Sequence, residues 1–316
     1  MVLLLTQHAR AWLMDSYLGW KTDFATPAGA AAYTDPGSVH WRVFKNPIAL
    51  GVGGVAAVLL EFADARIRSG VWDHSTYKVD PIGRSRRTGM AAMVGVYGPQ
   101  AAARRVIQGV TNMHGKVTGQ TPAGEAFRAM EPELLDWVSA TAGYGFLTAY
   151  DRFVAPLSAA DKARFYAEAA PVARLYGVTH SPKSTAGFMA MMEHLAPRFA
   201  PHPIVAEFLS IIASGRAAPG TPKALHRALA RASVSILPPL VRDTLQLGPT
   251  YDLDPVSRAL VKFAGTIAER VPVPGAPPAQ ACARLGLPKD FLYRSPKAQA
   301  RILARKDLTA LSSAHS

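Results

Sequence analysis

Apolar residues recur three and four positions apart along nearly the whole chain of 316 residues. This spacing places them on one face of an α-helix, and no convincing run of alternating apolar and polar residues indicates a strand. The pattern therefore predicts an all-α protein. With helix start and stop signals, it predicts helices over 8–19, 47–69, 84–96, 99–117, 131–153, 159–175, 184–195, 203–214, 222–246, 255–271 and, briefly, 279–285.

Several helix ends carry recognisable capping residues. Ser158 stands three positions before Asp161, so that each side chain can bind a free backbone amide at the start of a helix, and Gly177 marks the end of the same helix. Asp254 is placed to cap the helix predicted over 255–271, with Pro255 in its first turn, where the missing amide hydrogen costs nothing.

The most membrane-like segment is "PIALGVGGVAAVLLEF", which reaches Glu61 after about 14 apolar residues. A bilayer-spanning helix needs roughly 20. The segment therefore predicts a buried helix, in which Gly51, Gly53 and Gly54 allow another backbone to approach closely.

The chain divides best into one large helical domain with extensions at both ends. We expect an N-terminal extension over 1–24, a single multi-helix domain over 25–270, and a Pro-rich linker with a basic tail over 271–316. The linker is indicated by "VPVPGAPPAQ" (271–280), which cannot continue a helix. Beyond it, the tail either docks as a final helix through Ile302 and Leu303 or frays.

Composition limits the class of protein. Hydrophobic residues make up 49% of the chain and charged residues 18%, which describes a globular protein with a large interior. Cys282 is the single cysteine, which excludes an internal disulfide or a cysteine metal cluster and favours a reducing compartment. The start of the chain has no secretory signal. We expect a cytoplasmic protein.

The formal net charge is +13, with an excess of basic residues from Arg216 onwards. These charges are scattered through helical patterns and are not interleaved with aromatic residues, so solvated helix faces explain them and no nucleic-acid partner is expected. Peripheral contact of the basic C-terminal region with an anionic membrane stays open as an alternative.

One histidine lies on an otherwise apolar helix face. Ala103, Ile107, Val110, His114 and Val117 follow one another at spacings of four, three, four and three. Such a histidine is either a core residue with backbone or water partners, or an axial ligand of haem iron, for which the porphyrin supplies four further nitrogens. No HExxH sequence and no paired carboxylate–histidine motif indicates a metal site made by protein alone.

The segment "GRSRRT" places three arginines and a threonine at the start of a predicted helix. Arg84 and Arg87 share a face, Thr88 is four positions beyond Arg84, and Arg86 points elsewhere. Arginine and hydroxyl donors suit the two propionates of haem and the charge that develops on oxygen. A solvated basic cluster at a loop–helix junction is the competing interpretation.

An ordered series of motifs along the chain resembles a known family. The motifs are "HWRVFKNPIALGVGGVAAVLLEFADARIRSGVWDHSTYKVDPIGRSRRTGMAAMVGVYG" (40–98), "NMHGKV" (112–117) and "PELLDWVSATAGYGFLTAYDRFVAPLS" (132–158). They are similar to the MpaB-like and rubber oxygenase (latex-clearing protein) catalytic domain, over roughly 25–250. The resemblance implies an all-α fold that encloses a b-type haem.

The resemblance also implies roles for individual residues. The family pattern has an arginine, a basic residue and threonine three positions later, and about thirty residues on a histidine that is the proximal haem ligand. These match Arg84, Arg87, Thr88 and His114. The resemblance therefore implies His114 as iron ligand, Arg84 as propionate partner, and Arg87 with Thr88 on the distal side. His74, in "WDHSTY", matches a recurring family histidine and is expected in the pocket, with a loop histidine bonded to backbone as the alternative.

Three departures bear on the reaction. Rubber oxygenases have a lysine able to occupy the distal iron position where this chain has Arg87, and a guanidinium is a very poor ligand. The family often has a histidine–proline pair where this chain has Asp64 and Ala65, and "ARIRSG" offers no glutamate where rubber oxygenases have their proposed base. Rubber cleavage by the same steps is therefore not expected.

The sequence thus predicts a haem b-dependent oxygenase that acts on an apolar small molecule, isoprenoid- or lipid-like, with dioxygen or peroxide. The cofactor would perform the bond-making, while the protein binds and orients the substrate. A peroxidase or peroxygenase needs similar donors and stays open. Two further alternatives stay open: a haem-binding sensor or carrier without turnover, and a pocket that holds a lipid and no haem.

Overall fold

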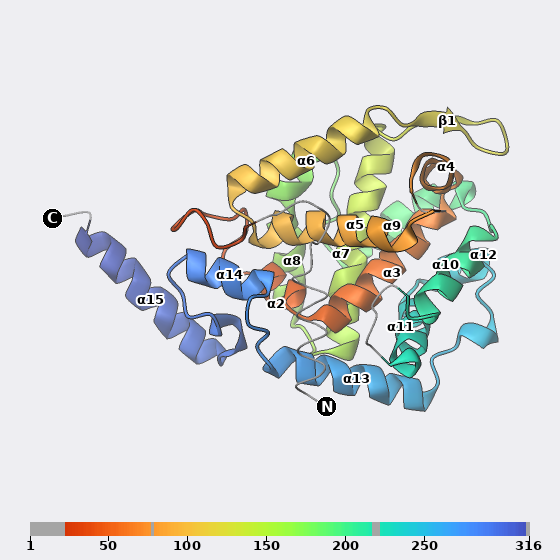
Figure 1. Cartoon of the computed structure of the whole chain (residues 1–316). Helices are drawn as coiled ribbons and strands as arrows, with labels where there is room; N and C mark the ends of the chain where they lie inside the picture. Colours follow the sequence, from red (N-terminus) through yellow and green to blue (C-terminus); the bar gives the residue numbers. More distant parts are fainter. Residues whose placement is uncertain (1–22, 77–78, 217–221, 314–316) are drawn as a thin grey trace.

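The computed structural model describes residues 23–76, 79–216 and 222–313. Within these ranges the chain is predominantly helical, as the apolar spacing predicted, with one short two-stranded sheet. Figure 1 shows α3 and α7 crossing the middle of the molecule, α6 along its upper side and α13 along its lower edge. The helix predicted over 8–19 lies outside the described residues.

The helices follow one another with short connections. In chain order they are α2 (Val39–Phe44), α3 (Pro47–Ala63), α4 (Ala65–His74), α5 (Pro81–Tyr97), α6 (Gln100–His114), α7 (Pro132–Phe153), α8 (Ala159–Leu175), α9 (Thr185–Leu195), α10 (Ile204–Ala213), α11 (Lys223–Ser235), α12 (Pro239–Thr244), α13 (Pro255–Arg270), α14 (Pro277–Arg284) and α15 (Pro296–Ser313). Single 3₁₀ turns lie at Ala196–Arg198, Pro249–Tyr251 and Phe291–Tyr293.

The packing of α3 against α7 forms the centre of the fold and depends on two glycines. A Cβ atom at Gly53 would stand 2.7 Å from the Cα of Phe146, and one at Gly145 would stand 2.4 Å from the carbonyl oxygen of Gly53. Any side chain at either position would push the two helices apart. The predicted close approach at Gly53 is confirmed, whereas Gly51 meets no atom within 4 Å.

Two hydrophobic clusters make up the core. The first joins α3 and α7 to helices α9 to α13 and contains Trp137 and Tyr144, both buried. The second joins α2, α5, α6, α8 and α14 to the opposite side of α7. Helix α7 therefore contributes to both clusters and connects the two halves of the core.

The structure divides two of the predicted helices. The helix predicted over 47–69 ends at Ala63, because Asp64 is extended and its carboxylate accepts the backbone N–H of Arg66 to start α4. The helix predicted over 222–246 ends at Ser235, and Pro239 begins α12 after Pro238, which has no amide hydrogen to continue a helix.

The helix predicted over 99–117 ends at His114, and a small hairpin follows it. Strands β1 (Thr118–Gln120) and β2 (Ala126–Arg128) pair antiparallel, with Gly119 opposite Phe127. Three-residue strands are too short to show an alternating pattern, which explains why the sequence did not predict them.

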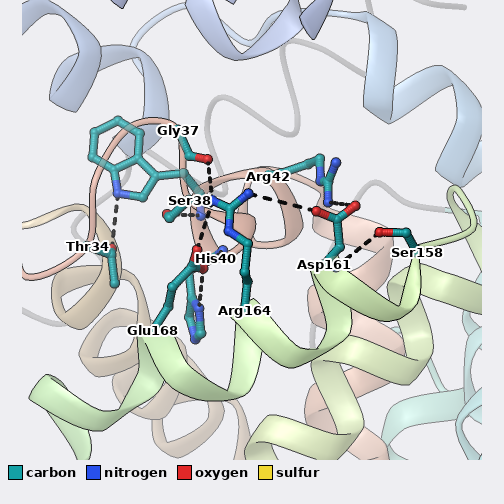
Figure 2. A network of polar contacts seen from close by, with 10 residues as sticks. Thr34, Gly37, Ser38, His40, Arg42, Ser158, Asp161, Arg164 and Glu168 are labelled. Carbon is teal, nitrogen blue, oxygen red and sulfur yellow. Dashed lines mark hydrogen bonds and ion pairs between the residues drawn. The ribbon is translucent and has the colours of Figure 1, made fainter. Parts of the chain in front are cut away.

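Polar contacts join α2 to α8 on the side of the second cluster (Figure 2). The carboxylate of Glu168 accepts the backbone N–H of His40 at 3.1 Å, and Arg42 pairs with Asp161 at 2.8 Å. Burial would raise the pKa of Glu168, but the hydrogen bonds and positive charges around it lower that pKa, so the side chain stays ionised. The predicted cap of α8 is present, since Ser158 accepts the backbone N–H of Asp161 at 3.0 Å.

The segment after α13 is part of the core. The predicted domain boundary at residue 270 coincides with the last residue of α13, yet α14 packs into the second cluster. The guanidinium of Arg284 is fully buried and donates to the carbonyl oxygens of Phe24, Ala30 and Tyr97. Ile302 and Leu303 of α15 pack against the same cluster, so the tail docks as a helix.

The structure also bears on the membrane question. Across residues 23–76, 79–216 and 222–313, we find no helix with the length and apolar content needed to cross a bilayer.

Candidate functional site

The α5–α6 hairpin brings two of the predicted site residues together. Only Gly98 and Pro99 separate the two helices, which pack against each other in opposite directions. The start of α5 therefore lies beside the end of α6, and Arg84 comes close enough to His114 to lower its pKa. A short connection between two antiparallel helices is sufficient to produce this pairing.

His114 is the last residue of α6 and remains partly accessible. Burial lowers the pKa of its imidazole, and the positive charge of Arg84 lowers it further. The ring is therefore neutral at pH 7. A neutral imidazole has a free lone pair, which is the state required of a metal ligand.

A carboxyl group that the sequence analysis did not single out lies in the same region. Glu61 projects from the last turn of α3, and its Oε1 is 3.4 Å from the hydroxyl oxygen of Thr141 on α7. Burial raises the pKa of Glu61 to about 7, although Arg84 and the hydrogen bond from Thr141 act in the opposite direction. Glu61 can therefore hold or release a proton close to neutral pH.

The hydroxyl of Thr141 has a second hydrogen-bond acceptor. It donates to the carbonyl oxygen of Val138 at 2.8 Å, which is shorter than its contact with Glu61. One hydroxyl proton cannot serve both acceptors well. The bond to Glu61 is the longer of the two, so it stabilises the carboxylate only weakly, which agrees with the raised pKa of Glu61.

Arg84 is the common neighbour of these groups. Its charge acts on Glu61 from α3 and on His114 from α6, so one guanidinium connects the two helices electrostatically. Arg84 is itself partly buried. The site thus combines a neutral imidazole, a permanent cation and a carboxyl group that titrates near pH 7.

The face of α3 that ends in Glu61 is apolar and incompletely covered. Gly54, Val55 and Val58 keep accessible surface on this face, whereas the remaining sides of the helix contain Val52, Ala56, Leu59 and Leu60, all fully buried. Partial access on one face of a central helix is what an apolar group packed against that face requires.

Arg87 and Thr88 are exposed, and their contacts lie elsewhere. Arg87 donates to the hydroxyl of Thr76 and stands 3.7 Å from the carboxylate of Asp80. Thr88 donates to the backbone carbonyl of Arg84 at 3.2 Å. The structure thus brings Arg84 beside His114, while Arg87 contacts the loop that precedes α5. A distal role for Arg87 and Thr88 stays a prediction.

Arg86 is more enclosed than the sequence suggested. It is partly buried, and its Nε is shielded from solvent without a hydrogen-bond partner among the residues described. Arg87, in contrast, is exposed. The relative burial of these two arginines could not be read from helical spacing alone.

His74 lies next to the hairpin that follows His114. It is exposed at the end of α4, and a Cβ atom at Gly119 of β1 would stand 3.4 Å from its Nε2. Its contact is therefore with the segment four to six residues beyond the predicted ligand. A direct role in a pocket stays a prediction.

Asp64, where the resemblance implied a histidine, has a structural role. Its carboxylate is fully buried and binds the guanidinium of Arg66 through both oxygens, at 3.1 and 2.7 Å. Arg66 pairs in turn with Glu133 of α7 at 2.8 Å. This chain of ion pairs fixes the corner between α3 and α4.

We tested whether these residues fit a haem. The neutral His114 would provide a nitrogen ligand, Arg84 would provide a cation for a propionate, and α3 would provide an apolar face. One turn before His114, the hydroxyl of Thr111 is buried and has no hydrogen-bond partner in the described part of the chain. A buried hydroxyl without a partner is unusual and is explained by a ligand that supplies one. The residues therefore fit the group.

The described residues contain no cluster of three or more histidine, cysteine, aspartate or glutamate side chains placed to hold a metal ion. Sequence reasoning missed Glu61, although a signal was present. A single carboxylate at the end of an otherwise apolar run is rare and marks a buried ionisable group.

Comparison with known proteins gives one match. No curated protein and no solved structure is similar to this chain at a significant level. A family model does match, over residues 41–268, and its description is "ER-bound oxygenase mpaB/B'/Rubber oxygenase, catalytic domain". The match includes all of α3 to α12 and nearly all of α13, and with them every residue of the site. The chain therefore belongs to the mpaB and rubber oxygenase catalytic domain family.

Proposed function

We propose that this chain is a haem-dependent oxygenase that oxidises an apolar, isoprenoid- or lipid-like substrate with dioxygen or peroxide. The family match supports an oxygenase-type activity. The observation that carries the proposal is the grouping of Arg84 on α5 with the neutral His114 of α6 and with Glu61 of α3, since the charge of Arg84 acts on both.

Each residue has a distinct task in this proposal. His114 would bind the iron through a ring nitrogen, and Arg84 would pair with a propionate carboxylate. Thr111 would donate its buried hydroxyl to the bound group. When bound, haem supplies the redox chemistry that activates the oxidant.

Glu61 would act as a general acid–base group beside the substrate. A carboxyl group whose pKa is about 7 can both give and take a proton at Oε1 under physiological conditions, which is the property of an effective acid–base group. Thr141 would hold the carboxyl in place from α7.

The apolar face of α3 defines the class of substrate. Val55 and Val58 offer no hydrogen-bonding group, so this face favours a hydrocarbon chain and excludes water. A substrate that lies there would approach the carboxyl of Glu61 at the end of the helix.

The proposal predicts oxygen consumption by the haem-loaded chain when a long isoprenoid alkene is added. The measurement uses an oxygen electrode, with a saturated alkane of the same length as the control substrate. We expect uptake with the alkene alone, because only the alkene has a reactive double bond.

The other outcomes separate the alternatives. Turnover that requires added peroxide and consumes no oxygen would identify a peroxygenase. A haem-loaded chain that turns over neither oxygen nor peroxide would contradict the enzyme and support a sensor or carrier.

A further inference from the structure

Helix α13 carries an apolar ridge that points away from the protein. Val256 is 78% exposed and Phe263 is 62% exposed, and Leu260 and Ile267 are partly exposed. These four residues stand at spacings of four, three and four, so they share one face of the helix. We call them the α13 ridge.

The opposite side of α13 is fixed to the core. Val261 is fully buried, and a Cβ atom at Gly265 would stand 2.5 Å from the carbonyl oxygen of Phe153. That side packs against α3, α7 and α11, and Leu260 of the ridge also packs against the first cluster, whereas Val256 and Phe263 face solvent. Figure 1 shows α13 along the lower edge of the molecule, away from α6.

The ridge is unusual for this protein. The other exposed large apolar residues in the described chain are Val79, Met113 and Leu240, which stand on three separate segments. Scattered exposed residues need no explanation, whereas two strongly exposed ones on a single helix face indicate a contact surface.

Positive charge lies along one side of the ridge. Arg258, Lys262 and Arg270 are exposed on the same helix, and none of them has an ion-pair partner among the described residues. The only carboxylate of α13 is Glu269, which is already paired with Lys45 at 2.9 Å and accepts the hydroxyl of Tyr150. The solvent-facing surface of α13 is therefore apolar and cationic.

A basic pocket opens beside the helix. It has a volume of about 340 Å³ and is lined by Arg152, Arg258 and Lys262 together with Phe153, Ser235 and Leu253. Arg152 is held in position because it donates to the carbonyl oxygen of Ser235 at 3.0 Å. Three cations and no carboxylate line this pocket, which suits the phosphate of a lipid headgroup.

We infer that the α13 ridge and this basic pocket form a docking surface for a membrane rich in anionic phospholipid. The apolar side chains would enter the boundary between headgroups and acyl chains, while the cations meet the phosphates. Stable attachment of a peripheral protein generally needs two such signals, and α13 provides both. A second copy of the chain fits less well, because a symmetric contact would bring the cations of both copies together.

The test is flotation of the full-length chain with vesicles of phosphatidylcholine alone or of phosphatidylcholine mixed with phosphatidylglycerol. We expect binding to the mixed vesicles only, and weaker binding at higher ionic strength. Phe263→Ser should weaken it roughly tenfold, because an inserted aromatic ring is lost. The double variant Arg258→Gln/Lys262→Gln should weaken it by at least tenfold, since each cation contributes on the order of a fivefold gain near such a surface.

Matched controls come from other faces of the molecule. Val79→Ser removes an exposed apolar residue, and Arg105→Gln/Lys183→Gln removes two exposed cations that lie outside α13 and do not line the basic pocket. Both should bind like the wild type. The variants change exposed side chains, so thermal unfolding followed by circular dichroism should be the same for all of them.

Three results would overturn the inference. The first is equal binding to both kinds of vesicle, and the second is unchanged binding of Phe263→Ser. The third is a wild-type dimer, measured by light scattering, that dissociates in Phe263→Ser, because the ridge would then be a contact between two copies.

Discussion

Replacing His114 by alanine should abolish the Soret band of the haem-loaded protein and leave the helical fold intact. In the proposed site the imidazole would be the iron ligand, and it is neutral because burial and Arg84 lower its pKa. Loss of groups that only support a metal ligand weakens metal binding by 10–100-fold, so loss of the ligand itself should weaken haem binding by at least about 100-fold. Absorbance titration with haemin measures this loss.

A matched histidine provides the control for this experiment. His194 is exposed on α9 and lies in the other half of the core from α6, so His194→Ala should keep the full Soret band. Added free imidazole should restore part of the band in His114→Ala, because the space left by the side chain can hold it. A wild-type Soret band in His114→Ala would show that the iron ligand is another residue.

Replacing Glu61 by glutamine should stabilise the haem-free protein at alkaline pH and have no effect in acid. The pKa of Glu61 rises from 4.5 to about 7 on folding, chiefly because burial disfavours the charged carboxylate. Below pH 4.5 the carboxyl is protonated in both states. As the pH rises towards 7, ionisation favours the unfolded chain, and above 7 the loss is complete.

Glutamine is neutral throughout and avoids this loss. The difference in the free energy of unfolding should therefore grow between pH 4.5 and 7 and level off at up to about 3 kcal/mol. Urea unfolding at a series of pH values measures it, and Glu207→Gln, on the exposed face of α10, is the control. A difference that is independent of pH would mean that Glu61 has an ordinary pKa.

The helical architecture followed from local patterns. Apolar spacing predicted the central helices, and the caps at Ser158 and Asp254 are both present in the structure. Predicting the site also required the packing of two helices, since the short connection between α5 and α6 places Arg84 beside His114. This pairing could be predicted from the sequence, because a connection of two residues is typical of an antiparallel pair of helices.

Other features depend on contacts that no local pattern shows. Glu61 belongs to the site because α3 packs against α7 and brings Thr141 to its carboxyl, and the two residues are 80 positions apart. The break at Asp64 depends on its buried ion pair with Arg66. The exposure of Arg87 depends on its contacts with the preceding loop, at Thr76 and Asp80. In each case a tertiary partner decides the outcome.

The departures from rubber oxygenases also become clearer. Asp64 serves the corner between two helices, so its presence in place of a histidine leaves the group around Arg84 unaffected. The segment "ARIRSG" has no glutamate, but Glu61 supplies a carboxyl one turn before it, at the end of α3. In the proposed function this carboxyl would be the acid–base group.

The proposed function depends on haem binding by this chain through the site on α3, α5 and α6. Titration of the purified, haem-free wild-type chain with haemin tests it most directly. We predict a Soret band that is distinct from that of free haemin and saturates at one haem per chain. A spectrum that remains the sum of protein and free haemin, with no saturation, would contradict the claim.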